Sequence, residues 1–166
     1  MDGPVSKFEI RAYSTADRME CQRVFQSNVP RFFREHELPE FLEFIDRGDC
    51  QYLVIRIEDR VIGCGGYGVR LGSEVADLCW GMVDADFHGR GAGEALLWER
   101  LSRIASETSI RAVRLGTSQW TQGFFQRAGF SIQSSKVDGY ALGIDEVEMR
   151  LELTAETREL IARRAG

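Results

Sequence analysis

Residues 83–97 read VDADFHGRGAGEALL, and this stretch decides the fold of the chain. A hydrophobic strand runs into a turn that contains Gly89, Gly91 and Gly93, and a helix opens directly from that turn. The first N–H groups of a helix have no partner inside the helix, and the helix dipole makes that end positive. Glycines let such amides approach an anion without interference from a Cβ atom. The stretch therefore predicts a cradle for a phosphate or diphosphate, with the cationic Arg90 beside it.

Three other interpretations of this turn are possible. A P-loop requires Lys followed by Ser or Thr after its last glycine, and this chain has neither there. A dinucleotide-binding GxGxxG fingerprint would place glycine at Glu94 and an acidic residue at the end of the next strand, which reads LGTS over 115–118. A glycine-rich turn without any ligand remains open, because glycine is common in turns.

The residues on either side of this stretch predict one mixed α/β domain over residues 1–166, with a core at about 8–153 and a short C-terminal helix at 154–166. The expected elements are strand 8–13, helices 14–28 and 38–48, a hairpin of strands 51–57 and 61–71, strand 75–83, helix 91–107, strand 110–116, a short helix 123–127, strands 131–134 and 146–153, and helix 155–164. A loop is expected over 138–143. The strand–helix–strand unit at the centre carries the glycine turn.

Composition excludes several classes of protein. The chain has 166 residues, of which 43% are hydrophobic and 28% charged, as in ordinary globular domains. No apolar run is long enough to span a membrane, and the N-terminal residues do not form a secretory signal. A net charge of −5 argues against neutralising nucleic-acid phosphates. Four cysteines without a CxxC pair predict reduced, mostly buried thiols and no metal site, so we expect a cytoplasmic protein.

Two segments carry a family resemblance. Residues 83–97 resemble the coenzyme A signature of the GNAT N-acyltransferase superfamily, [Q/R]xxGx[G/A], with His88 at the first position and Gly91 and Gly93 at the small positions. Residues 124–130, FFQRAGF, resemble the family segment FYEKLGF. The order of elements over residues 8–153 is also that of the family. The resemblance implies a GNAT fold: a central, mostly antiparallel sheet of about six or seven strands, with a βαβ acyl-CoA-binding core flanked by helices.

The resemblance implies an N-acetyltransferase that moves an acetyl group from acetyl-CoA to a primary amine by direct attack in a ternary complex. In the family, the turn amides hold the diphosphate and the fourth strand contacts the pantetheine and acyl group, with a main-chain N–H at about Met82 or Val83 facing the thioester carbonyl. Ser118 stands where the family has Asn. The cofactor-binding residues implied in this way are Gly81, Met82, Val83, His88, Gly89, Arg90, Gly91, Ala92, Gly93, Ser118 and Phe125.

The catalytic groups are less completely matched. The family often uses an acid on the fourth strand, six residues before the position of Val83, and that residue is Asp77. Asp77 is thus a candidate general base, with a solvated strand residue as the alternative, and Glu74 is a second candidate that would act through water. The family's proton-donating Tyr is replaced by Phe125. Tyr140 or Tyr67 could protonate the leaving thiolate, or no side chain does, since a thiol pKa near 8.5 already makes a fair leaving group.

The expected partner is a small-molecule or peptide amine, with no nucleic acid and no membrane, and a homodimer is the default assembly. An alternative from another functional class is a catalytically silent acyl-CoA-binding or regulatory module of the same fold, which the loss of Tyr at Phe125 suggests. A nicotinamide-binding Rossmann protein would instead bind NAD rather than coenzyme A.

Overall fold

The computed structural model describes residues 7–166, so the N-terminal residues 1–6 used in the secretory-signal prediction lie outside the described part. The strands are β1 (Glu9–Ala12), β2 (Gln51–Ile57), β3 (Arg60–Val69), β4 (Val75–Val83), β5 (Ala112–Thr117), β6 (Ser131–Ala141) and β7 (Ile144–Glu152). The helices are α1 (Arg18–Ser27), α2 (Leu38–Arg47), α3 (Ala92–Ala105), α4 (Gln122–Arg127) and α5 (Ala155–Ala165), with short 3-10 turns η1 (Thr15–Asp17), η2 (Glu35–Glu37) and η3 (Ala85–Phe87).

The described strands form one seven-stranded sheet in the order β1-β2-β3-β4-β5-β7-β6. Every neighbouring pair is antiparallel except β4 and β5, which are parallel and joined through α3. A parallel pair needs a crossover connection, and a helix is its usual form. The predicted mixed α/β architecture, with a mostly antiparallel sheet around one strand–helix–strand unit, is confirmed.

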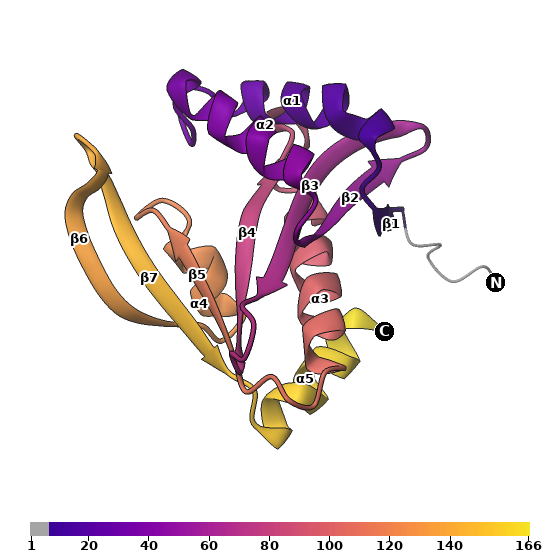
Figure 1. Cartoon of the computed structure of the whole chain (residues 1–166), viewed down its shortest axis with the longest axis vertical. Helices are drawn as coiled ribbons and strands as arrows, with labels where there is room; N and C mark the ends of the chain where they lie inside the picture. The colour runs from indigo at the N-terminus through magenta and orange to yellow at the C-terminus, as the bar shows by residue number, and fades with distance from the viewer. Residues whose placement is uncertain (1–6) are drawn as a thin grey trace.

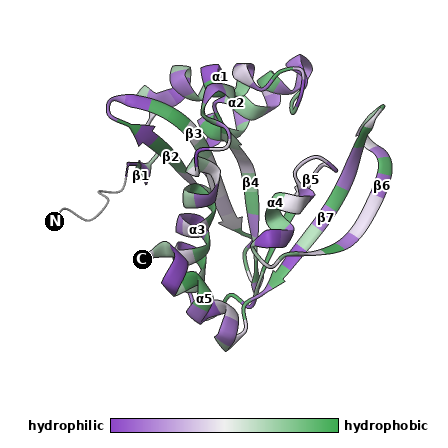
Figure 2. Ribbon diagram, turned by 180° about the vertical axis from the view of Figure 1, so that it is seen from behind, coloured by the Kyte–Doolittle hydropathy of each residue, from purple (hydrophilic) through white to green (hydrophobic). Residues whose placement is uncertain are grey.

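The sheet is covered on both faces. Helices α1 and α2 pack on one face through Cys21, Val24, Phe25, Phe41 and Ile45, the apolar positions that the helical periodicity predicts. Helix α3 packs on the other face, and Figures 1 and 2, seen from opposite sides, show the two layers. Because strand side chains alternate between faces, neighbouring positions of β3 serve different layers. Strand β4 lies between the α1–α2 layer and the α3 layer, and Figure 2 shows hydrophobic colour along much of it.

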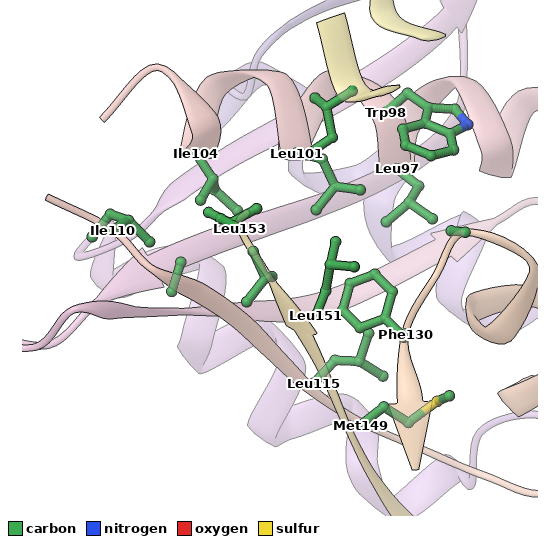
Figure 3. Close-up of a cluster of buried hydrophobic side chains, with 14 of the residues drawn as sticks. Leu97, Trp98, Leu101, Ile104, Ile110, Leu115, Phe130, Met149, Leu151 and Leu153 are labelled. Carbon is green, nitrogen blue, oxygen red and sulfur yellow. The ribbon is translucent and has the colours of Figure 1, made fainter. Parts of the chain in front are cut away.

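A second hydrophobic cluster lies beneath α3 and α5, where β5 and β7 pack against α3. Leu97, Leu101 and Ile104 point from α3 toward Leu115, Met149 and Leu151 of the two strands (Figure 3). All six side chains are at most 5% exposed. This packing fixes α3 against β5 and β7. No described helix is long and apolar enough to cross a bilayer.

The parallel pair β4–β5 stays together over only three residue pairs, ending at Asp77 opposite Arg114. Beyond this point β4 continues along β3, while β5 continues along β7 up to Thr117. The two halves of the sheet therefore diverge, as Figure 1 shows. Residues 78–83 of β4, which we call the open edge, have no strand partner on the β5 side within the described residues.

One prediction about the C-terminal hairpin is wrong. Residues 138–143 were expected to form a loop, but β6 runs through to Ala141 and the turn lies at Leu142-Gly143. The pairing of β6 with β7 is irregular between Lys136 and Ala141, and Asp138 takes a positive φ of 55° there. The Asp138-Gly139 sequence forms a bulge and not a turn, and it predicts either one, because both can require a residue with a positive φ.

The glycines of β3 differ sharply in the space around them. A methyl group on Gly66 would lie 2.6 Å from Cδ2 of Tyr52 and 2.7 Å from the carbonyl oxygen of Gln51. One on Gly68 would have its nearest contact at 3.5 Å, with Cβ of Cys50. We expect Gly66→Ala to lower the free energy of unfolding by about 2–3 kcal/mol, because overpacking forces the strand backbones apart.

Gly68→Ala is the matched control in the same strand, and its expected effect is within about 0.5 kcal/mol. Urea denaturation of both variants measures the difference. Equal unfolding free energies for the two variants would show that the close approach of β2 and β3 at Gly66 is not required.

Candidate active site

The glycine turn is built as the sequence predicts. Gly89 and Gly91 have φ values of 73° and 87°, a left-handed conformation that glycine adopts without steric strain. Gly91 is the N-cap of α3 and provides no side chain to cap it. Its carbonyl accepts the first helical hydrogen bond, from the N–H of Ala95, at 3.0 Å. Within residues 7–166 no acceptor meets the N–H groups of residues 89–93, so an anion can take them up.

Buried polar groups hold the strand end from which this turn starts. Asp84 is 2% exposed, accepts the N–H of Asp86 at 3.0 Å and forms ion pairs with Arg23 at 2.8 Å and Arg60 at 3.2 Å. Nδ2 of Asn28, on the loop after α1, donates to the carbonyl oxygen of Val83 at 2.9 Å. Sequence reasoning missed Asp84 and Asn28, because their partners lie about 24 to 61 residues away and only the fold brings them together.

The side chains of His88 and Arg90 have partners of their own. Nε2 of His88 donates to the carbonyl oxygen of Val83 at 2.8 Å, and its ring contacts Phe32 edge-on. Arg90 is exposed and lies over the ring of Phe87, 5.1 Å from its centroid. The structure therefore gives His88 a role in closing the turn, while the long Arg90 side chain stays at the surface beside the free amides.

Gly93 is the second residue of α3 and lies between the end of β4 and helix α4. A methyl group there would contact Cγ2 of Val83 at 3.6 Å and the ring of Phe124 at 3.8 Å. Val83 ends β4 in one half of the diverging sheet, and Phe124 lies on α4, the helix that follows β5 of the other half. Gly93 thus leaves space where a ligand held at the turn would pass between the halves.

The open edge of β4 contains a bulge. Trp80 has a φ of 43°, unusual for a residue with a side chain, and the register with β3 shifts between Cys64 and Gly66. Gly81 is exposed, whereas Met82 is buried. The N–H of Asp84 donates to Ile62 of β3 at 2.7 Å. Because strand hydrogen bonds alternate in direction, the N–H of Val83 points the other way, toward the diverging space.

The diverging strands enclose a cleft of about 370 Å³. It is lined by Arg70, Asp77, Leu78, Arg114, Leu115, Gly116, Glu146 and Glu148. Asp77 lies at its base, where Oδ1 accepts from Nε of Arg114 at 2.8 Å and Arg70 lies 4.0 Å away. This hydrogen bond and the Asp77 charge raise the pKa of Arg114. Asp77 is therefore an ion-paired carboxylate that faces the cleft.

The other predicted acid–base residues are placed differently. Glu74 precedes β4 at the paired end of the two strands, is exposed, and forms an ion pair with Arg111 at 3.6 Å. Tyr67 packs partly buried against the α3 side of the sheet. The structure brings neither of them to the cleft.

Tyr140 of β6 lies beside the cleft. Its hydroxyl lies over Gly116 of β5, so close that a methyl group on Gly116 would be 2.6 Å from it. Burial raises the pKa of Tyr140, and the charges of Glu146, Glu37 and Glu148 raise it further. Tyr140 consequently keeps its proton at neutral pH and can donate it.

The two remaining predicted residues lie where β5 leads into α4. The carbonyl oxygen of Ser118 accepts the N–H groups of Thr121 and Gln122, at 3.2 and 3.1 Å, and so starts the helix. Phe125 packs edge-on against Phe124 and Phe130, with ring centroids 5.0 and 5.8 Å apart. It serves the core and offers no proton. In the described part of the chain no group of three or more metal-binding side chains comes together.

Comparisons with known proteins agree with this geometry. Residues 20–130, two thirds of the chain, match the model of the acetyltransferase (GNAT) family. No curated protein matches the chain. Among solved structures, a GNAT-family protein from Desulfovibrio desulfuricans is 26% identical, with a TM-score of 0.77 over 89% of this chain and 99% of that one.

Two further solved structures share the fold at lower identity. The ribosomal-protein-alanine N-acetyltransferase of Brucella melitensis is 19% identical, with a TM-score of 0.69, 87% of this chain and 99% of that one being covered. An aminoglycoside 6'-N-acetyltransferase complexed with coenzyme A is 12% identical, with a TM-score of 0.72, 88% of this chain and 97% of that one being covered. Because the family model matches two thirds of the chain, the chain belongs to the GNAT family of acetyltransferases.

Proposed function

We propose that this protein transfers an acetyl group from acetyl-CoA to a primary amine by direct attack in a ternary complex. The observation that carries the proposal is the row of unpartnered amides at the start of α3, which opens onto the diverging space between β4 and β5. Amides at a helix N-terminus bind phosphate oxygens, and here they would hold the diphosphate of coenzyme A. The coenzyme A complex of the aminoglycoside 6'-N-acetyltransferase, which shares this fold, supports the assignment.

The pantetheine arm would pass Gly93 and follow the open edge of β4 toward Gly81. On the way, the N–H of Val83, directed into the diverging space, is the donor that would meet the thioester carbonyl. Such a donor accelerates acyl transfer because negative charge develops on that oxygen only during the reaction. Met82, which is buried against the α1–α2 layer, would hold the strand in place behind it.

The acceptor amine would occupy the cleft on the other side of the strands. An alkyl ammonium has a pKa near 10.4, so it must lose a proton before its nitrogen can attack. Asp77 at the base of the cleft is our proposed acceptor of that proton, since it is the carboxylate of β4 that lines the cleft. Glu146 and Glu148, on the β7 wall, would attract a cationic acceptor.

In the transfer itself the amine nitrogen bonds to the carbonyl carbon, and the carbonyl electron pair moves to oxygen. The nitrogen, now positively charged, gives up its second proton to solvent, and when the pair returns the carbon–sulfur bond breaks and its electrons leave with sulfur as the coenzyme A thiolate. Tyr140 is our proposed donor of a proton to that sulfur, because its hydroxyl reaches the β5 wall at Gly116. A thiol pKa near 8.5 also allows the sulfur to leave as an anion.

We propose further that the chain acts as one domain in the cytoplasm, with a homodimer as its default assembly. All four cysteines are free, and Cys21 and Cys64 are buried, which fits a reducing compartment.

Thioester consumption tests the proposed reaction. The protein is mixed with acetyl-CoA and a panel of polyamines, amino acids, aminoglycosides and peptides, and free thiol is measured together with the mass of the acceptor. We expect stoichiometric thiol release and an acceptor heavier by one acetyl group. Tight coenzyme A binding without thiol release for any amine would instead support the catalytically silent acyl-CoA-binding module.

A further inference from the structure

Arg100 is a buried arginine in the middle of α3. Its side chain faces the sheet, and the residue is only 4% exposed. The guanidinium lies against the β4 bulge and the facing strand: methyl groups built on Gly81 and Gly65 would lie 3.0 Å from Nη2 and 3.2 Å from Nη1, respectively. Glycine at both positions leaves room for the guanidinium to approach the two strand backbones closely.

The charge of Arg100 has no counter-ion in the described part of the chain. No carboxylate of residues 7–166 lies within ion-pair distance of it. Nε and Nη1 donate to the carbonyl oxygens of Leu96 and Gly66, both at 3.4 Å, and Nη2 donates to no group of these residues. The titratable side chains that act electrostatically on its guanidinium are those of Tyr52, Cys79 and Cys64, and none of them is a carboxylate.

Arg100 nevertheless stays protonated at neutral pH. Burial lowers the pKa of its guanidinium to about 10, which is still well above neutrality. An unpaired buried charge disfavours folding, and replacing buried ionic groups by apolar residues of similar volume is often neutral or stabilising. Core packing alone therefore does not explain why a cation stands here.

The position of the charge relates it to the open edge of β4. Gly81, directly over Nη2, is exposed at the bulge. Arg100 lies nine residues after the N-cap of α3, which at 1.5 Å per residue is about 14 Å along the helix from the free amides. An extended ligand arm anchored at those amides and following β4 would bring its distal end to the level of Arg100.

We propose that Arg100 is an electrostatic element of the acyl transfer, whose positive charge beneath the β4 bulge stabilises the negative charge that develops on the thioester oxygen and then on the departing sulfur. The inference rests on the function proposed above. In that reaction the thioester is neutral, the tetrahedral intermediate carries one negative charge on oxygen, and the same charge leaves on sulfur when the carbon–sulfur bond breaks. A fixed charge in a low-dielectric setting favours both anions over the neutral ground state.

Phe125 stands where the family has a proton-donating Tyr, so the positive charge of Arg100 would be needed to stabilise the leaving thiolate. Phe125 packs against Phe124 and Phe130 and cannot protonate sulfur. A guanidinium that lowers the pKa of the coenzyme A thiol would let the thiolate depart without a proton. The charge acts across the exposed backbone at Gly81 and so requires no cavity that reaches Arg100 itself.

Arg100→Met removes the charge and keeps a long side chain. We expect kcat to fall about tenfold or more with little change in KM for acetyl-CoA, because only the charged states are destabilised. The thiol pKa of bound coenzyme A, followed by the ultraviolet absorbance of the thiolate, should rise by about one unit or more. The variant should unfold at the same or a higher urea concentration, and Arg100→Lys should retain most of the activity.

Arg103→Met is the matched control, one turn further along α3, where Arg103 is half-buried and paired with Glu99 at 2.9 Å. It should leave kcat and the thiol pKa unchanged. If Arg100→Met does not fold, Arg100→Gln provides the same comparison with a polar side chain. Unchanged kcat and thiol pKa in the neutral variant would overturn the role of Arg100, whereas a wild-type protein that binds no coenzyme A would overturn the proposed function itself.

Discussion

Gly93→Glu is expected to abolish coenzyme A binding, with a loss of affinity of about 100-fold or more, since it adds a negative charge at the positive end of α3. The added side chain would also fill the space between Val83 and Phe124. The protein itself should remain folded, because Gly93 has helical backbone angles and a β-carbon there meets only ordinary contacts at 3.6 and 3.8 Å. Isothermal titration calorimetry measures the loss.

Gly93→Gln is the control for size without charge. It should weaken binding less than the Glu variant, and the difference between them reports the electrostatic part. Coenzyme A affinity that survives Gly93→Glu would mean that the ligand does not use the start of α3.

Asp77→Asn is expected to lower kcat about 100-fold, in the range typical for loss of a general base, while coenzyme A affinity stays the same. Affinity should be unaffected because Asp77 lies at the base of the cleft, at the last residue pair of β4 and β5, and not at the glycine turn. The ion pair with Arg114 is partly exposed, so its loss should change stability by less than about 1 kcal/mol. Steady-state kinetics over a range of pH make the measurement.

Glu74→Gln is the matched control, since Glu74 is an exposed, ion-paired carboxylate three residues earlier that the structure places outside the cleft. Its kcat should remain near that of the wild type. If Asp77→Asn leaves the pH–rate profile unchanged in shape and height, the base is another group.

The parts of this account that sequence could predict are local in the chain. The cradle needs only glycines at the start of a helix, so the close spacing of Gly89, Gly91 and Gly93 predicts it, and the family resemblance extends the prediction to residues 88–93. The apolar stripes of α1, α2 and α3 follow from helical periodicity in the same way. The order of the strands around the central unit then follows from the family resemblance.

The parts that sequence missed depend on contacts between distant residues. The ion pair of Asp77 with Arg114 exists because the parallel strands set these residues side by side. Tyr140 could be placed at the cleft only once β6 was found to extend past the bulge at Asp138.

The position of Arg100 in the sequence is already unusual. It lies between Leu97 and Ile104 at the spacing of the buried stripe of α3, where a charged residue is unusual. A cation at core spacing marks a position that packing alone does not explain.

Calorimetric titration of the wild-type protein with coenzyme A tests the central claim most directly, because it asks whether the free amides at the start of α3 hold a diphosphate. We predict saturable binding in the micromolar range, no binding of NAD under the same conditions, and loss of the coenzyme A signal in Gly93→Glu. Absence of coenzyme A binding below millimolar concentration would contradict the account.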